Sequence, residues 1–160
     1  TFKLVLPIAR DRGGRQVDLI DGLSVDGSYV PRILLVEDSK LNRSVIEAML
    51  DKLPIRLSSA EDGEQAMELA QTTRFDLVLM DVGLPGMDGY ECTRRLRALP
   101  DQHKFAVVAI TAQALKGDRE RMIDAGFDDY LPKPFRKKAL ISKISENLEV
   151  STSIAGESEN

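Results

Sequence analysis

Short apolar runs alternate with helical patterns along most of this chain, and this alternation limits the possible folds more than any other feature. The runs at residues 33–36, 55–59, 77–80, 105–110 and 129–131 predict strands, because short apolar segments between turn residues are typical of buried strands. Apolar residues recur at helical spacing after each run. Five strands alternating with five helices predict an α/β fold with a parallel sheet, right-handed crossovers and helices on both faces.

Capping and breaking residues indicate where the helices begin and end. Asp62 and Asp88 each open a helix with the spacing of a capping box, Pro54 closes the first helix, and Gly126 suits the position after the fourth.

The apolar positions of the first helix are Leu41, Val45, Met49, Leu50 and Leu53. Those predicted to face inward from the last helix are Leu140, Ile141, Ile144 and Leu148.

The regular pattern covers residues 31–150 and leaves three other segments. Residues 1–8 alternate partly, like the end of a strand whose partners are missing. Residues 9–30 are too apolar for a free linker and too rich in glycine for a helix, so we interpret them as a connector. Residues 151–160 are polar, which predicts a disordered tail.

Composition excludes several classes of protein. The chain has 26 acidic and 22 basic residues and a net charge of -4, so it lacks the broad positive charge of a nucleic-acid-binding protein. No apolar run is long enough to span a membrane, and no signal peptide is recognisable. The single cysteine, Cys92, excludes an internal disulfide and a cysteine-based zinc site and suits a small core residue. We expect a cytoplasmic protein without direct membrane contact.

Polar residues stand where four of the predicted strands end. The first strand is followed by Glu37 and Asp38, the third by Asp81, the fourth by Thr111 and the fifth by Lys133. If the strands are parallel, these ends meet at one edge of the sheet, where ligands bind in open α/β sheets. Taken alone, Asp81 is explained equally well as a carboxylate that takes part in chemistry and as the residue that begins the Pro/Gly-rich turn after its strand.

The convergence of three carboxylates suggests a metal site. Such groups repel one another, and a divalent cation removes this conflict. Hard oxygen ligands favour magnesium, or manganese, over zinc, and magnesium commonly binds carboxylates together with a substrate phosphate. Asp81 is then a candidate nucleophile that forms an acyl phosphate, while Lys133 and the metal neutralise the transferring oxygens.

Four segments together resemble the receiver domains of response regulators. They are Ile33-Leu34-Leu35-Val36-Glu37-Asp38, the run from Leu79 to Gly89 (LMDVGLPGMDG), Ala109-Ile110-Thr111-Ala112, and Tyr130-Leu131-Pro132-Lys133-Pro134-Phe135. Each is a weak signal, but all four in this order and spacing are specific. The resemblance covers residues of about 31 to 150 and implies a flavodoxin-like sheet with strand order 2-1-3-4-5.

The resemblance also implies roles for individual residues. Asp81 would accept phosphoryl from a phosphohistidine of a partner protein. Glu37, Asp38, Asp81 and the backbone carbonyl of Gly83 would hold Mg²⁺. Lys133 would contact the phosphoryl group and be joined to the following proline by a cis peptide bond.

Thr111 and Tyr130 would form a coupled switch pair. After phosphorylation Thr111 would move toward the phosphate and the Tyr130 ring would turn inward, which would reshape the face formed by the fourth helix and the fifth strand.

Two positions depart from the usual pattern of the family. Glu37 precedes Asp38 where many members have two aspartates, so its longer side chain would shift the metal slightly. Gly83 stands where a larger polar residue is common, which opens the pocket around Asp81 to water. We expect metal binding to persist.

The N-terminal segment Thr1-Phe2-Lys3-Leu4-Val5-Leu6-Pro7 resembles, more weakly, the last strand of a histidine-kinase ATP-binding domain. This resemblance implies a hybrid sensor histidine kinase as the parent protein, although this chain has no kinase motifs of its own. Its partners would be a histidine-kinase dimerisation and phosphotransfer domain and a histidine-phosphotransfer protein. His103, the only histidine, is interpreted as a loop residue rather than a phosphocarrier.

Two other functions are alternatives to that of a phosphoacceptor. A magnesium-dependent phosphohydrolase can use an aspartate nucleophile after a strand, but no second acid follows Asp81 at short spacing and no cap-sized insertion is present. An interaction module that is never phosphorylated would not need the complete set of polar strand ends.

Overall fold

Five strands and five helices alternate in the computed structural model, which describes residues 30–100, 105–112 and 116–158. The strands are β1 (Arg32–Val36), β2 (Arg56–Ala60), β3 (Leu77–Asp81), β4 (Ala106–Thr111) and β5 (Asp129–Pro132). The helices are α2 (Lys40–Leu50), α3 (Gly63–Thr72), α4 (Gly89–Arg97), α5 (Lys116–Ala125) and α6 (Lys137–Ser158). Residues 1–8, residues 9–29 of the predicted connector 9–30, and His103 lie outside the described residues.

The strands form one parallel sheet in the order β2-β1-β3-β4-β5. This confirms the flavodoxin-like order predicted from the resemblance. β3 lies in the middle of the sheet, with Leu79 beside Leu35 of β1 and beside Val108 of β4. All five residues of β3 are buried, as expected for a strand covered on both faces.

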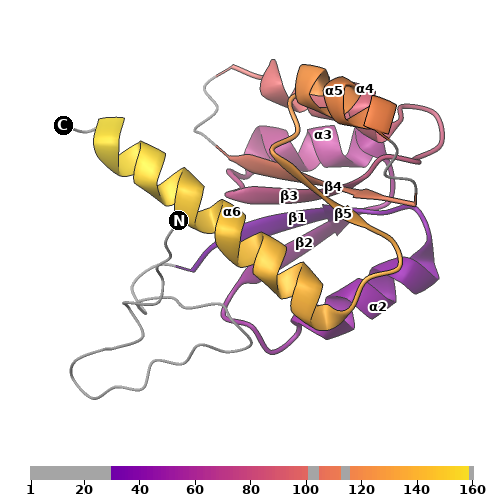
Figure 1. The fold of residues 1–160 in the computed structure, drawn as a ribbon, viewed down its shortest axis with the longest axis horizontal. Helices are drawn as coiled ribbons and strands as arrows, with labels where there is room; N and C mark the ends of the chain where they lie inside the picture. Colours follow the sequence, from indigo (N-terminus) through magenta and orange to yellow (C-terminus); the bar gives the residue numbers. More distant parts are fainter. Residues whose placement is uncertain (1–29, 101–104, 113–115, 159–160) are drawn as a thin grey trace.

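The two faces of the sheet bury separate cores. Helices α3, α4 and α5 cover one face, and α2 and α6 cover the other (Figure 1). Successive residues of β1 point to opposite faces, because side chains alternate along a strand. Leu34 therefore packs with Ala66 of α3 in one core, whereas Ile33 packs with Ile144 of α6 in the other.

Local capping occurs where the sequence predicts it. The side chains of Asp62 and Asp88 accept hydrogen bonds from the backbone N–H groups of Gln65 and Glu91, at 2.8 and 2.9 Å. Gly126 follows α5 with a φ of 104°, a left-handed conformation that favours glycine.

The structure adds detail to two of the sequence interpretations. The apolar positions expected on α2 include Leu41 and Val45, but these side chains are 74% and 46% exposed, and Ile46 and Leu50 are the buried residues of this helix. The apolar arc of α2 is wider than the strip that the sheet covers, and its sequence does not show which part faces inward.

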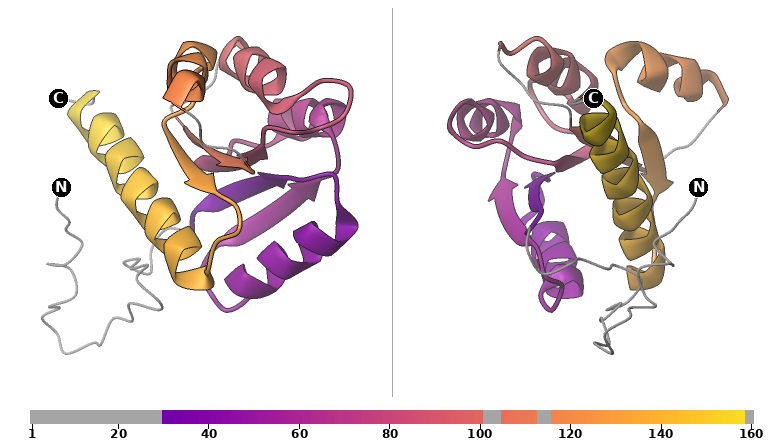
Figure 2. Two further views of the ribbon diagram at one scale, coloured as in Figure 1. Left: turned by 45° about the vertical axis from the view of Figure 1, so that its right-hand side comes forward. Right: turned by 90° about the vertical axis from the view of Figure 1, so that its left-hand side faces the viewer.

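The second detail concerns the C-terminal end. Residues 151–160 are predicted to be a disordered tail, whereas α6 continues to Ser158 and extends past the edge of the sheet (Figure 2). Extending an existing helix avoids the unfavourable nucleation step, so a polar segment can continue it. Within the described residues, no helix is long and apolar enough to cross a membrane.

Candidate functional site

The carboxyl edge of the sheet brings together the acids that follow β1 and end β3. One oxygen from each of Glu37, Asp38 and Asp81 can be chosen so that all three lie within 4.8 Å of one another. Glu37 and Asp81 are buried, at 1% and 7% exposure, and Asp38 is exposed. The predicted acidic cluster therefore forms, with two carboxylates below the surface and one at its rim.

Lys133 lies against both buried acids. Its Nζ is 3.4 Å from Glu37 Oε1 and 3.8 Å from Asp81 Oδ2. The Lys133 backbone N–H donates to the carbonyl of Thr111 at 2.7 Å, which fixes the loop after β5 beside the end of β4. The peptide bond from Lys133 to Pro134 is cis, as predicted.

The electrostatic environment of Asp81 disfavours its charged form. Burial raises the pKa of this carboxyl above its usual value of 3.8, and the charges of Glu37 and Asp38 raise it further. A hydrogen bond from the Gly83 N–H, at 3.0 Å, and the Lys133 ammonium act in the opposite direction without reversing the shift. A single lysine thus does not neutralise the cluster, and a bound cation would relieve the remaining repulsion.

The turn after β3 leaves one side of Asp81 open. A Cβ atom at Gly83 would meet only Asp81 Oδ1, at 3.7 Å, so the glycine leaves space next to the carboxylate. Gly89 has a different role, since a Cβ there would lie 2.5 Å from the Asp81 carbonyl oxygen. The first residue of α4 must be glycine for this helix to pack so closely against the end of β3.

The predicted switch residues lie on β4 and β5. Thr111 is 4% exposed and pairs in register with Pro132, whereas Tyr130 is 39% exposed. Thr111 is thus in the buried layer at the carboxyl edge, and the Tyr130 ring is accessible to solvent.

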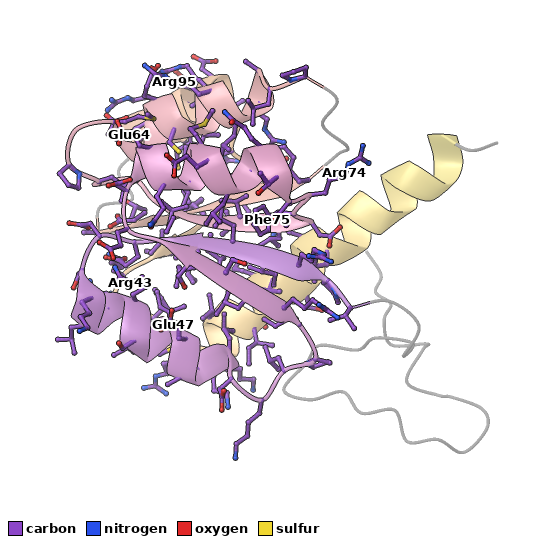
Figure 3. The ribbon with its side chains drawn as sticks, turned by 180° about the vertical axis from the view of Figure 1, so that it is seen from behind. Arg43, Glu47, Glu64, Arg74, Phe75 and Arg95 are labelled. Atoms are coloured by element: carbon purple, nitrogen blue, oxygen red, sulfur yellow. The ribbon has the colours of Figure 1, made fainter. Side chains whose placement is uncertain are left out.

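Two residues near the acids were missed by the sequence interpretation. Asn42 Nδ2 donates to Glu37 Oε2 at 3.4 Å, and Arg43 Nη1 donates to the Glu37 carbonyl at 2.9 Å. Arg43 lies on α2, beside the sheet (Figure 3). Their only signal in the sequence is their position, in the first turns of the helix that follows the acidic pair.

The donor set suits a hard divalent cation. Three carboxylates supply oxygen ligands in a cluster that spans less than 5 Å, and such ligands favour Mg²⁺ or Mn²⁺. Glu37, Asp38 and Asp81 could hold the ion at the open rim while Lys133 remains near Asp81. The residues therefore fit a metal site of the predicted kind.

Comparison with known proteins gives a consistent family. The family model described as "Response regulator receiver domain" matches residues 33–145. Sensor protein GacS of Pseudomonas syringae is 36% identical over 116 residues, which are 71% of this chain and 13% of that protein. Histidine-protein kinase BarA of Escherichia coli is 36% identical over 108 residues, or 68% of this chain and 12% of BarA. The chain thus spans about an eighth of these relatives' length.

A solved structure extends the comparison to three dimensions. The receiver domain of the sensor histidine kinase PA1611 from Pseudomonas aeruginosa is 43% identical, with a TM-score of 0.69 over 76% of this chain and 99% of that one. That structure is described as having a magnesium ion coordinated in its active-site cleft. By sequence match and by fold, this chain belongs to the response regulator receiver domain family.

Proposed function

We propose that this domain accepts a phosphoryl group on Asp81 from a phosphohistidine of a partner protein. The strongest support is the geometry around Asp81, where two other carboxylates lie within 4.8 Å and the Lys133 ammonium is 3.8 Å from Oδ2. A candidate nucleophile, two further candidate metal ligands and an ammonium group therefore lie together at one strand end.

The proposed chemistry is an in-line displacement at phosphorus. A carboxylate oxygen of Asp81 attacks the phosphorus atom, the phosphorus–nitrogen bond of the phosphohistidine breaks, and its electron pair returns to the imidazole. The product is an acyl phosphate on Asp81 and a free histidine on the partner. Lys133 is close enough to Asp81 to hold the negative oxygens of the transferring group.

In this proposal Glu37, Asp38, Asp81 and the Gly83 carbonyl hold Mg²⁺. When bound, the ion supplies positive charge that offsets the carboxylate repulsion and the phosphoryl charge. The magnesium described for the PA1611 receiver domain supports this choice of metal over Mn²⁺. Gly83 leaves the approach to Asp81 open, and we infer that water reaches the acyl phosphate by that route.

Thr111 and Tyr130 are proposed to transmit the modification. Thr111 follows Ile110, which pairs with Asp81 across β3 and β4, so its hydroxyl is close in the fold to the site of phosphorylation. Movement of Thr111 toward the phosphate would vacate space beside β4. The exposed Tyr130 ring would then turn inward and change the surface of β5 and α5.

We further propose that this receiver domain belongs to a hybrid sensor histidine kinase in the cytoplasm. The match to GacS and BarA, a sensor protein and a histidine-protein kinase, supports this origin. Its partners would then be a histidine-kinase dimerisation domain and a histidine-phosphotransfer protein.

The central experiment tests phosphorylation directly. After incubation with acetyl phosphate and Mg²⁺, mass spectrometry of the intact wild-type chain should find one added phosphoryl group. Asp81→Asn should abolish the addition, and Asp51→Asn, an exposed aspartate after α2, should retain it. An unchanged mass in the wild type would contradict the proposal, and sustained turnover of phosphomonoesters would favour a phosphohydrolase instead.

Lys133→Ala provides a second, separate prediction. The variant should fold, because the Lys133 side chain is 25% exposed, but acetyl phosphate should not phosphorylate it measurably. Lys138→Ala, a nearby exposed lysine, is the control and should be phosphorylated normally. Normal phosphorylation of Lys133→Ala would show that the ammonium is not needed at the transferring group.

A further inference from the structure

Glu37 is held on both sides of its carboxylate. The side chain is 1% exposed, so its carboxylate must form hydrogen bonds or ion pairs with protein groups instead of water. Oε1 is 3.4 Å from Lys133 Nζ. Oε2 accepts from the Ser39 N–H at 3.2 Å and from Asn42 Nδ2 at 3.4 Å.

These contacts give the two oxygens different surroundings. Lys133 Nζ, which is near Glu37 Oε1, is also 3.8 Å from Asp81 Oδ2. Oε1 therefore lies on the side of the carboxylate that faces the phosphoacceptor. Oε2 lies on the side of the first turn of α2, where its donors among the described residues, the Ser39 N–H and Asn42 Nδ2, are neutral.

Arg43 fixes the backbone of the same residue. Its Nη1 donates to the Glu37 carbonyl at 2.9 Å, and its Nη2 is 3.9 Å from Glu61 Oε2. The Arg43 side chain is only 14% exposed, so its guanidinium is largely packed into the protein. The start of α2 thus holds Glu37 at two points, the carbonyl and the carboxylate.

We propose that Asn42 is a positioning residue for metal binding, because it holds Glu37 Oε2 and so turns Oε1 toward Asp81. This inference rests on the proposed Mg²⁺ site. Glutamate has one more rotatable bond than aspartate, and a ligand with that freedom loses more entropy when a metal binds. A donor that fixes the unused oxygen reduces this cost, as hydrogen bonds to metal-ligating carboxylates commonly do.

The Asn42 contact is long for a hydrogen bond between nitrogen and oxygen. Its acceptor is a buried carboxylate, however, and the low local dielectric constant there strengthens polar interactions. Loss of an outer partner of a metal ligand typically weakens metal affinity by about 10- to 100-fold. We expect Asn42→Ala to lie near the lower end of this range, because the Ser39 N–H still reaches Oε2.

Isothermal titration of the metal-free protein with Mg²⁺ tests the proposal without any measurement of phosphorylation. Asn42→Ala should bind Mg²⁺ about 10-fold more weakly than the wild type. The matched control is Asn147→Ala, which removes another helical asparagine whose Nδ2 donates to a carboxylate, that of Asp129, at 3.1 Å. This control should lose stability and keep the wild-type affinity.

A double-mutant cycle with Glu37→Asp separates positioning from a general loosening of the site. The aspartate is shorter by about 1.5 Å, one carbon–carbon bond, so Asn42 no longer reaches its carboxylate. Asn42→Ala should then change the Mg²⁺ affinity of the Glu37→Asp protein little.

The outcomes are distinct. Wild-type affinity in Asn42→Ala, equal losses in Asn42→Ala and Asn147→Ala, or an undiminished effect of Asn42→Ala in the Glu37→Asp protein would each overturn the positioning role. A wild-type protein that binds no Mg²⁺ would instead overturn the proposed metal site, and with it this inference.

Discussion

Asp81 combines burial with two acidic neighbours, so the metal-free fold carries an electrostatic penalty at the residue on which the proposed function depends. Burial is the main cause of its raised pKa, and Glu37 and Asp38 add to it. A side chain kept for chemistry at a cost in stability is common at functional sites. Asparagine has nearly the same shape as aspartate but no charge. The difference in stability between the wild type and Asp81→Asn therefore measures this electrostatic penalty.

We therefore predict that Asp81→Asn stabilises the metal-free protein. In EDTA at pH 7, urea denaturation should show a free energy of unfolding higher by roughly 0.5–2 kcal/mol. A group with a raised pKa in the folded state favours folding while it is protonated, and this contribution is lost as the pH rises through the folded pKa. The advantage of Asp81→Asn should therefore disappear near pH 4.

Mg²⁺ provides the internal control for this prediction. Saturating Mg²⁺ should stabilise the wild type, because a ligand that binds only the folded state raises the free energy of unfolding. It should stabilise Asp81→Asn less, so the difference between the two proteins should shrink. Equal stability of the two proteins in EDTA would mean that the carboxylates do not repel one another as described.

The sequence predicted the residues of this site that follow from chain direction. Asp81 and Lys133 end parallel strands, and parallel strands bring their carboxyl ends to one edge whatever the details of packing. Asn42 and Arg43 were not predicted, because their contacts depend on how α2 leaves β1 and on which rotamers reach back to Glu37. The residue pattern determines neither the direction of α2 nor these rotamers.

At the scale of elements, one arginine joins three segments at the edge of the sheet opposite the acids. Arg97, at the end of α4, donates to the carbonyls of Gly126 and Phe105, each at 2.7 Å, and to Asp128 Oδ2, also at 2.7 Å. Its guanidinium also lies 4.5 Å from the centre of the Phe105 ring. The side chain thus links α4 to the start of β4 and to the turn between α5 and β5.

We predict that Arg97→Lys lowers the free energy of unfolding by about 1–3 kcal/mol. A lysine ammonium is a compact charge that cannot reproduce the planar set of donors of a guanidinium, so part of these partners would be left without a hydrogen bond. Denaturation with urea measures the change.

Arg95→Lys is the matched control for this prediction. Arg95 is on the same helix, but its side chain is 55% exposed and, among the described residues, pairs with Glu91 through Nε at 2.8 Å. Exposed pairs of this kind contribute little, so the control should change stability much less. A similar loss in both variants would contradict the linking role of Arg97.

The elements differ in how well their sequences predict them. The strands were found because they are short, apolar and bounded by turn residues, and the capping at Asp62 and Asp88 is local enough to read directly. The orientation of α2 was not predictable, because Leu41 and Val45 continue the helical spacing of Met49 although they face solvent. The length of α6 was underestimated, because polarity alone does not end a helix that is already formed.

At the scale of the whole molecule, the exposed apolar pair on α2 lies beside the proposed phosphorylation site. α2 begins two residues after Asp38, and Leu41 and Val45 are one turn apart, so they share a face of the helix. A protein that delivers phosphoryl to Asp81 must cover the rim of the acidic cluster. Exposed apolar side chains at such a position are candidates for contact with that protein.

We predict that Leu41→Ala slows phosphotransfer from the phosphohistidine of a partner protein and leaves phosphorylation by acetyl phosphate unchanged. The small donor needs only the acidic site, whereas the protein donor also needs the surface around it. A loss of about 1.4 kcal/mol in partner binding, within the range for truncated interface residues, corresponds to a tenfold weaker complex. The rate is measured from quenched time points of transfer from a partner that carries a radiolabelled phosphoryl group, at receiver concentrations below saturation.

Ile123→Ala is the matched control, because Ile123 is also a large exposed apolar residue, 61% accessible, but lies on α5 on the opposite face of the sheet. Alanine supports helices well, so neither substitution should unfold its helix. If transfer slows equally in the two variants, the partner does not bind preferentially to the exposed apolar residues of α2. If Leu41→Ala also slows the reaction with acetyl phosphate, the substitution has disturbed the acidic site, and Leu41 does not act through partner contact alone.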